Sequence, residues 1–355
     1  MEEIESIADI QELVRSGFND WSVFGDVRTV EKDGLVLFNY TARAQYAYRW
    51  NFFERVSRGL ILNAETGDVV ARGFDKFFNW MEGGRCTNAS IVSVTEKMDG
   101  SLILGYYWKG DWHYATRGSL DSDQALWAKE YARRNFDMGT FGPEIDTNMT
   151  LLFEAIYPEN RIVVDYGGRE DLVLLAARNR ADGKYLNRWL LSIVADAICA
   201  NITPVYLFNS WEDVLDARER LTVNQEGFVA EFYDGQRFKF KGDQYMYLHR
   251  LISGLSFKNT LKAVADGKLD ALLESVPDEF LNDVHLWVLE INATAQWKEN
   301  EVESWYAAAP TGSRKEFALW VNKHCPHLAT YLFKRHDGKD YVQDIYKKEF
   351  DRTDT

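Results

Sequence analysis

The chain has 355 residues, of which 46% are hydrophobic and 27% are charged, a composition typical of a globular protein long enough for two domains. No apolar run approaches the roughly 18 to 20 residues that cross a bilayer, and the acidic start lacks a secretion signal, so the sequence predicts a cytoplasmic protein without a membrane partner. The formal net charge of −14 argues against a nucleic-acid partner, although a local basic groove can lie on an acidic body.

Residues 1–245 are predicted to form an α+β domain. Residues 1 to about 30 are typical of a helix followed by a loop that leads into the first strand. Ten strand-like runs then follow, bounded by turn residues, at 34–40, 59–62, 68–71, 91–95, 101–108, 112–116, 150–156, 172–177, 227–233 and 236–241. The runs between 91 and 116 are expected to form one hairpin group, and helices are expected at 123–135 and 186–200. Asp234-Gly235 is a strong hairpin signal between the last two strands.

Residues 246–355 carry no strand signal and are predicted to form a mostly helical second domain. Pro277, Pro310 and Pro326 fall between or at the ends of the helical runs, where helices stop. The expected helices lie at 248–255, 259–265, 278–293, 315–323 and 341–350.

Lys97 begins the most informative segment, Lys97–Gly100, in which a lysine stands two residues before an Asp-Gly turn. A lysine amine attacks phosphorus only when it is unprotonated, and burial or neighbouring cations favour that form. We expect Lys97 at the end of a strand, beside a turn. An isolated K-x-D-G match is most often a solvated hairpin lysine, but here further carboxylates and cations follow in order, so Lys97 is a candidate nucleophile.

Two glutamates are candidate ligand-binding groups. Glu154 lies in the apolar run Leu151–Ile156, and a buried carboxylate needs a partner such as a sugar hydroxyl, an amide or a cation. Glu226 precedes the strand 227–233 and is a candidate for binding a metal or the ribose-phosphate region. The alternatives are an edge-strand glutamate and a plain loop glutamate.

Lys239 and Lys241 are predicted to share one face of a strand, because side chains alternate with period two. Phe240 between them would point into the core. Two cations on one face repel each other, so an anionic partner is expected and phosphate is the natural candidate. The alternative is an exposed basic strand.

Other motifs are weaker. The segment His324–His327 contains two histidines and Cys325, but it has too few ligands at suitable spacing to predict a zinc site. Cys86, Cys199 and Cys325 are scattered and odd in number, which indicates reduced thiols. The sequence holds neither a G-x-G-x-x-G motif nor a Walker loop.

The ordered motifs resemble those of the covalent nucleotidyltransferases, the superfamily of ATP-dependent polynucleotide ligases and mRNA capping enzymes. Three features are similar to the phage-type RNA ligases that reseal broken tRNA. They are Arg58-Gly59 about forty residues before the lysine motif, the K-F-F-N of Lys76–Asn79, and the Y-x-x-L-H of Tyr245–His249. The resemblance covers roughly residues 35–250. It implies an antiparallel-sheet, ATP-grasp-like ligase domain, followed by a helical domain in the place of an RNA-specificity domain.

The resemblance also implies roles for individual residues. Lys97 would carry AMP, Glu226 would assist the metal-dependent steps, and Glu154 would hold the ribose. Cationic contacts to the ATP phosphates would come from Arg58, Lys76, Lys239 and Lys241, with Lys239 near the α-phosphate. The rest of the nucleotide site would comprise Tyr40, Phe78, Asp99, Gly100 and Arg117. Arg117 stands in a T-R-G-S segment where that branch has T-K-G-S, which keeps the charge but changes the donor geometry.

The implied reaction joins RNA 3′-hydroxyl and 5′-phosphate ends through a lysyl-AMP and an RNA-adenylate, with ATP and Mg²⁺ or Mn²⁺. The RNA would be single-stranded or the broken anticodon loop of a tRNA, and a kinase–phosphatase is a candidate partner that prepares the ends. Four alternatives stay open: a capping guanylyltransferase, a DNA ligase, an AMP-transferase acting on small molecules or proteins, and an inactive RNA-binding module. Because a DNA ligase would have a β-barrel after Lys241, the helical pattern there disfavours it.

Overall fold

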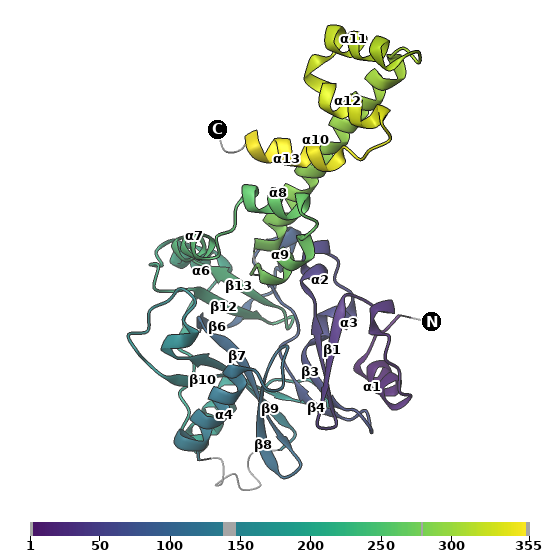
Figure 1. The fold of residues 1–355 in the computed structure, drawn as a ribbon. Helices are drawn as coiled ribbons and strands as arrows, with labels where there is room; N and C mark the ends of the chain where they lie inside the picture. The colour runs from purple at the N-terminus through teal and green to yellow at the C-terminus, as the bar shows by residue number, and fades with distance from the viewer. Residues whose placement is uncertain (1–2, 138–146, 278–279, 353–355) are drawn as a thin grey trace. The chain divides into compact units, whose positions relative to one another are not determined.

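The computed structural model describes residues 3–137, 147–277 and 280–352. The chain forms two compact units, residues 1–44 with 48–252, and residues 45–47 with 253–355. The first unit is α+β and the second is helical (Figure 1). A boundary at residue 245 would fall within helix α7 (Asp243–Ile252), which belongs to the first unit. Within the described residues, no helix is both long and apolar enough to cross a membrane.

The first sheet is an antiparallel meander of β1 (Val27–Lys32), β2 (Leu35–Tyr40), β3 (Arg58–Asn63) and β4 (Val69–Arg72). The predicted 59–62 and 68–71 hairpin is confirmed as β3 and β4. The first four residues of β1 fall in the predicted loop, and only Val27 of its six side chains is buried, which explains its weak signal. One face packs against α1 (Ile7–Arg15) and α3 (Phe52–Val56), each started by a capping box.

The second sheet has the order β10-β9-β7-β8 and carries the largest core. Its strands are β7 (Ser101–Trp108), β8 (Asp111–Thr116), β9 (Met149–Ile156) and β10 (Asp171–Asn179). Helices α4 (Asp123–Asn135) and α5 (Arg188–Ile198) contribute to this core. The other face packs on the first sheet through Leu37, Ile61, Leu104 and Leu152.

The third sheet has the order β11-β6-β12-β13-β5. Its strands are β5 (Phe78–Asn79), β6 (Ile91–Lys97), β11 (Val205–Tyr206), β12 (Gly227–Phe232) and β13 (Arg237–Lys241). The predicted hairpin of β12 and β13 is confirmed. The predicted hairpin group at 91–116 is only partly right, because β6 pairs with β12 and β11, whereas β7 pairs with β8 and β9. The chain therefore passes from one sheet to another at residues 98–100.

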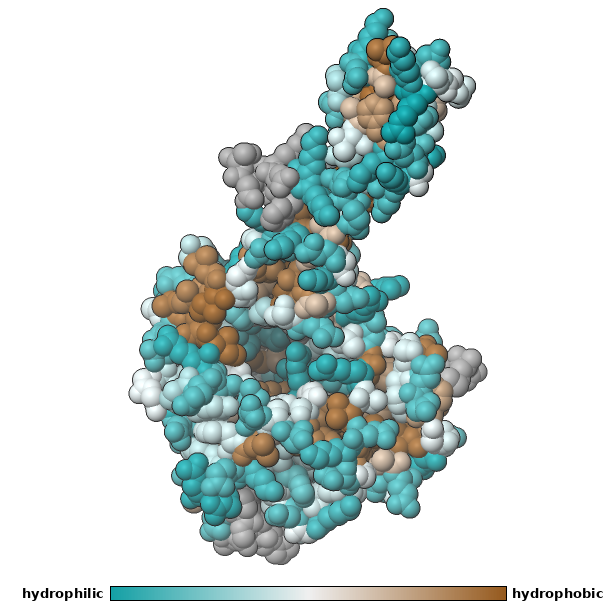
Figure 2. Space-filling view, viewed as in Figure 1, coloured by the Kyte–Doolittle hydropathy of each residue, from teal (hydrophilic) through white to brown (hydrophobic). Residues whose placement is uncertain are grey.

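Helix α6 (Trp211–Glu219) covers one face of the third sheet, over the core of Phe228, Phe238 and Phe240. Helix α7 follows β13, and Figure 2 shows an apolar patch in its region. Leu251 and Ile252 of this helix are exposed. The remaining short elements of this part of the chain are α2 (Ala42–Ala47) and the 3-10 turns Trp21–Val23, Glu82–Gly84 and Pro158–Asn160.

The second unit is built from α8 (Phe257–Ala265), α9 (Leu269–Ser275), α10 (Leu281–Ala308), α11 (Arg314–His324), α12 (Ala329–His336) and α13 (Val342–Arg352), with a 3-10 turn at Pro326–Leu328. The prediction of a helical region is confirmed. Helix α10 is longer than expected, and the expected start at Asp278 lies outside the described residues. Its carboxy-terminal half packs with α11, α12 and α13 around Val302, Phe317 and Leu332.

Candidate active site

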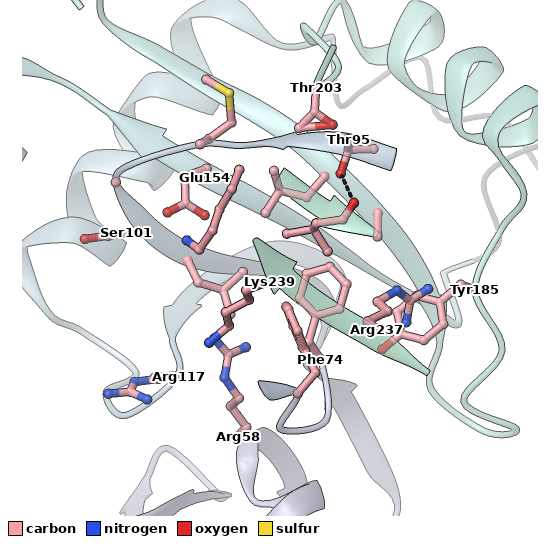
Figure 3. A pocket seen from close by; sticks show the side chains of 18 of the residues that line it. Arg58, Phe74, Thr95, Ser101, Arg117, Glu154, Tyr185, Thr203, Arg237 and Lys239 are labelled. Atoms are coloured by element: carbon pink, nitrogen blue, oxygen red, sulfur yellow. Dashed lines mark hydrogen bonds between the residues drawn. The ribbon is translucent and has the colours of Figure 1, made fainter. Parts of the chain in front are cut away.

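A cavity of 570 Å³ lies in the first unit, between the second and third sheets, with further walls from the β1–β3 region (Figure 3). Six residues predicted for the site line it: Arg58, Lys97, Gly100, Arg117, Glu154 and Lys239. Figure 3 shows Arg58 and Lys239 directed into the same space as Glu154. The cavity therefore gathers residues that are far apart in the sequence.

The register of the third sheet explains one wall of this cavity. Strand β12 lies between β6 and β13, and its alternate residues form cross-strand rows with both neighbours. The rows are Lys97–Gly227–Lys241, then Thr95–Val229–Lys239, and last Ser93–Glu231–Arg237. Since side chains alternate in a strand, all three rows face one side, while the phenylalanines between them enter the core under α6. The prediction that Lys239 and Lys241 share a face opposite Phe240 is confirmed.

Lys97 and Lys241 share one buried carboxylate. Lys97 Nζ lies 2.8 Å from Glu226 Oε2, and Lys241 Nζ lies 2.9 Å from Glu226 Oε1. Burial alone would raise the pKa of Glu226, but the two ammonium groups outweigh it and lower the pKa. Gly227 makes this arrangement possible, because its φ of +149° suits glycine and a Cβ there would collide with the Phe240 carbonyl oxygen. The sequence predicts cations around Lys97. The structure shows that its ion-pair partner is the Glu226 carboxylate.

Lys239 and Arg58 have fewer partners than Lys97 and Lys241. Burial lowers the pKa of Lys239 well below its usual value, and the nearby Lys76, Lys241, Lys97 and Arg58 lower it further. Among the described residues, no carboxylate forms an ion pair with Lys239, whose Nζ lies 5.1 Å from the Phe77 ring centre. Nη1 of Arg58 is buried and has no hydrogen-bond partner within the described part of the chain. Both cations are therefore suited to an anionic ligand.

Glu154 projects from β9, opposite Leu102 and Val173 of the flanking strands. Burial raises the pKa of Glu154 to about 8, with Glu226 and Asp99 adding to the rise and Lys97 and Arg58 opposing it. No hydrogen bond to its carboxylate is found within the described residues, so the partner expected for a buried carboxylate is not supplied by that part of the protein.

Gly100 and Asp99 position the lysine segment. A Cβ at Gly100 would collide with the carbonyl oxygen of Ala155, so only glycine allows β7 to start this close to β9. Asp99 is buried and does not line the cavity. Its Oδ1 accepts a hydrogen bond of 2.8 Å from Tyr245 Oη, and its Oδ2 accepts from the backbone N–H groups of Val163 and Val164 at 2.9 and 2.8 Å. Where the sequence suggested a nucleotide contact, the structure shows a carboxylate bonded to three protein donors.

Tyr40, Lys76 and Phe78 contact one another or Arg117. Arg117 Nη1 donates to Tyr40 Oη at 2.6 Å. The Lys76 ammonium is buried against aromatic rings, 5.0 Å from the centre of Trp50, 5.1 Å from Tyr40 and 5.8 Å from Phe78. Tyr40, Lys76 and Phe78 are absent from the described cavity lining. The phosphate contact expected of Lys76 stays a prediction.

Several cavity residues were missed from the sequence. Arg237 continues the alternation of Lys239 and Lys241 by one step, so the period-two pattern could have found it. It forms a 2.9 Å ion pair with Glu231, and its guanidinium lies 3.8 Å from the ring centre of Tyr185. Arg28 and Asn39 also line the cavity, but no local sequence pattern marks them.

Comparison with known proteins agrees with this geometry. A family model described as RNA ligase, of the T4 type, matches residues 56–247, just over half of the chain. The chain belongs to this RNA ligase family. The segment of this chain that matches the family runs from Val56 to Tyr247. It contains Arg58, Lys97, Glu154 and Lys239.

Three proteins illustrate how far the similarity extends. A protein of Autographa californica nuclear polyhedrosis virus, named as a bifunctional polynucleotide kinase/RNA ligase, is 30% identical over 67% of this chain and 38% of its own length. The chain thus spans well under half of that relative. An RNA ligase of Rhodothermus phage RM378 is 22% identical over 88% of this chain and 89% of its own length. A structure of a Naegleria gruberi RNA ligase variant with ATP and Mn has a TM-score of 0.37 and 21% identity, covering 46% of this chain and 52% of that one.

Proposed function

We propose that this protein is an ATP-dependent RNA ligase that acts through a covalent lysine–AMP intermediate on Lys97. The observation that carries the proposal is the placement of Lys97 in one cavity with two cations, Arg58 and Lys239, that have no ion-pair partner in the described chain. The matching ligase family supports the same chemistry. A nucleophilic lysine beside unneutralised cations suits attack on a polyphosphate.

In the first step, the lone pair of Lys97 Nζ would attack the α-phosphorus of ATP. The N–P bond forms, the P–O bond to the leaving group breaks, and pyrophosphate departs. The amine must lose a proton, and Glu226, at 2.8 Å, is the carboxylate placed to hold it. Arg58 and Lys239 would stabilise the charge on the leaving oxygens. Burial lowers the pKa of Lys239 in the free protein, and a bound phosphate would favour its protonated form.

Glu154 would bind the ribose. Its carboxylate lines the cavity, is buried and accepts no hydrogen bond from the described residues. A sugar hydroxyl is a neutral donor, and the Glu154 carboxyl group can accept a hydrogen bond from it in either protonation state. Burial raises the pKa of Glu154 to about 8. A bound hydroxyl that donates a hydrogen bond to the ionised carboxylate would lower this pKa.

A divalent cation would bind with the help of substrate phosphates. Among the described residues, no group of three or more His, Cys, Asp or Glu side chains could hold a metal ion, so a complete cage of protein ligands is not built there. Mg²⁺ commonly binds through one or two carboxylates plus phosphate oxygens, and Glu154 and Glu226 fit that role. Such an ion would neutralise phosphate charge in the reaction. Glu226 would have to exchange one lysine contact for the metal.

Two further transfers would complete ligation. An oxygen of an RNA 5′-phosphate attacks the phosphorus of lysyl-AMP, the N–P bond breaks, and a 5′–5′ pyrophosphate linkage forms. An RNA 3′-hydroxyl then attacks the RNA phosphorus, and AMP leaves. We propose a role in RNA repair, including that of tRNA, with a kinase–phosphatase that prepares the ends. The kinase/ligase name of the relative from the nuclear polyhedrosis virus supports such a pairing.

The proposal is tested by incubating the protein with Mg²⁺ and α-labelled ATP or GTP, followed by denaturing electrophoresis and peptide mapping. Label from ATP on Lys97 is the expected result, and a 5′-phosphorylated single-stranded RNA is then the substrate to seal. Label from GTP alone would indicate a capping guanylyltransferase. Absence of label from both nucleotides in folded protein would favour an inactive RNA-binding module.

A further inference from the structure

A polar row crosses three adjacent strands of the first sheet. In the register of this sheet, Arg28 of β1 stands opposite Asn39 of β2, and Asn39 stands opposite Arg58 of β3. All three line the cavity that contains Lys97. On the same face of β2, away from Asn39, the side chains are apolar. Leu35 and Leu37 pack there against the second sheet. The face therefore changes from core to an Arg–Asn–Arg row where it reaches the cavity.

The turn at Gly118 closes over this row. A Cβ placed on Gly118 would lie 3.2 Å from Arg28 Nη2 and 3.2 Å from Asn39 Nδ2. The guanidinium and the amide thus point to the same spot beside a residue that has no side chain. Arg117, the preceding residue, also lines the cavity. Two donor groups from adjacent strands therefore meet beside the turn, which is a suitable arrangement for an anion.

Arg28 is exposed, and no carboxylate of the described chain forms an ion pair with it. Lys32, on the same face of β1 four residues later, provides the contrast, because its Nζ lies 2.6 Å from Asp121 Oδ2. Asn39 is 4% exposed, and its Oδ1 has no hydrogen-bond donor among the described residues. An anion alone cannot satisfy this acceptor, whereas a ligand that carries both a phosphate and a hydroxyl can.

We propose that Arg28 and Asn39 bind the 5′-terminal sugar-phosphate of the RNA strand that receives AMP. This inference rests on the proposed ligase function. Neighbouring strands lie about 4.8 Å apart, so Arg28 stands roughly 10 Å across the sheet from Arg58. Arg58 lies near Lys239, where the nucleotide phosphates would bind, and Arg28 would provide a second phosphate position in the same cavity. The transfer of AMP to RNA requires two phosphates side by side, one on Lys97 and one on the incoming end.

The test uses Arg28→Ala, with Lys32→Ala as the matched control on the same strand face. The binding arm compares RNA carrying a 5′-phosphate with the same RNA carrying a 5′-hydroxyl, by fluorescence anisotropy at fixed salt without nucleotide. We expect the unsubstituted protein and Lys32→Ala to prefer the 5′-phosphate, and Arg28→Ala to lose that preference. The kinetic arm follows one turnover of AMP from pre-adenylylated protein to 5′-phosphorylated RNA. Arg28→Ala should slow it about tenfold or more, the loss expected for one charge-assisted contact.

The remaining outcomes separate this inference from the proposed function. If Arg28→Ala slows labelling of the protein by ATP as much as transfer to RNA, the row serves the nucleotide phosphates and the inference is overturned. An effect of Lys32→Ala equal to that of Arg28→Ala would likewise overturn it, since general electrostatic attraction would explain both. An unsubstituted protein without a 5′-phosphate preference would also refute the site. Failure of ATP labelling with an intact, Arg28-dependent preference would refute the ligase function and leave the phosphate site standing.

Discussion

Two sets of charged groups in the cavity region differ in how they are partnered. Lys97, Glu226 and Lys241 form a closed set, in which both carboxylate oxygens bind an ammonium group at 2.8 and 2.9 Å. Arg58, Lys239 and Glu154 form an open set, whose members have neither an ion pair nor a side-chain hydrogen bond within the described residues. The two sets line or adjoin the same space, yet only the first is satisfied by the protein itself.

The difference indicates which part of the site is built by folding and which part is completed by a ligand. Charges that are buried with partners can stabilise the folded chain, whereas charges that are buried without them cost free energy. The displaced pKa values fall mainly on the open set, raised to about 8 at Glu154 and lowered at Lys239, both chiefly through burial. A nucleotide with its ribose hydroxyls and phosphates would supply the missing partners of all three groups.

The largest expected effect comes from replacing the nucleophile while keeping the closed set charged. Lys97→Arg retains a cation beside Glu226, but a guanidinium stays protonated and cannot attack phosphorus. We expect ATP-dependent labelling of the protein to fall at least about a thousandfold, with thermal stability little changed. Labelling is followed by denaturing electrophoresis, and unfolding by circular dichroism.

Lys184→Arg is the matched control for this substitution. Lys184 is exposed and its Nζ lies 3.3 Å from an Asp182 carboxylate oxygen, so labelling should equal that of the unsubstituted protein. Covalent labelling that persists in Lys97→Arg would contradict the assignment of the nucleophile, and peptide mapping would then identify the residue that carries AMP.

Removing the carboxylate that Lys97 and Lys241 share should have the next largest effect, on the free energy of unfolding. Glu226→Ala leaves two lysines without their shared carboxylate, and breaking a buried pair costs about 3 to 5 kcal/mol of unfolding free energy. Glu231→Ala, on the same strand, breaks a more exposed pair with Arg237 and should cost about 1 kcal/mol or less. Urea denaturation measures both. Equal costs would show that the closed set does not stabilise the fold.

The sequence predicted these groups better than it predicted their surroundings. The strand positions of Lys97, Lys239 and Lys241 follow from local alternation, which depends only on a few neighbouring residues. The pairing of β6 with β12 brings together segments about 130 residues apart, and no local pattern encodes it. For this reason the K-x-D-G segment was expected in a hairpin, although it joins two sheets.

The same limit explains the residues whose surroundings were mistaken or missed. Asp99 is held by Tyr245 and by two backbone amides of a later loop, contacts that appear only once three distant segments pack together. Lys76 follows the expected motif, but the aromatic rings around its ammonium come from separate segments, including Tyr40 and Trp50. Arg28 and Asn39 become neighbours of Arg58 only through the sheet register.

A further expected effect is a pH dependence of stability that belongs to the open set. Burial raises the pKa of Glu154 from 4.5 to about 8, so between these values the folded protein binds a proton that the unfolded chain has released. Stability from this group is therefore present below about pH 4.5 and is lost as the pH rises towards 8. The slope can reach about 1.4 kcal/mol per pH unit.

Comparison with Glu154→Gln isolates this contribution, because other titrating groups are the same in both proteins and the amide does not ionise. Urea unfolding without nucleotide, at several pH values between 5 and about 8, should give a stability difference that grows with pH in favour of the glutamine variant. A difference that stays constant with pH would mean that Glu154 is already ionised in the free protein. The open set would then hold a partner for this carboxylate, and the ribose hydroxyl would no longer be needed to account for it.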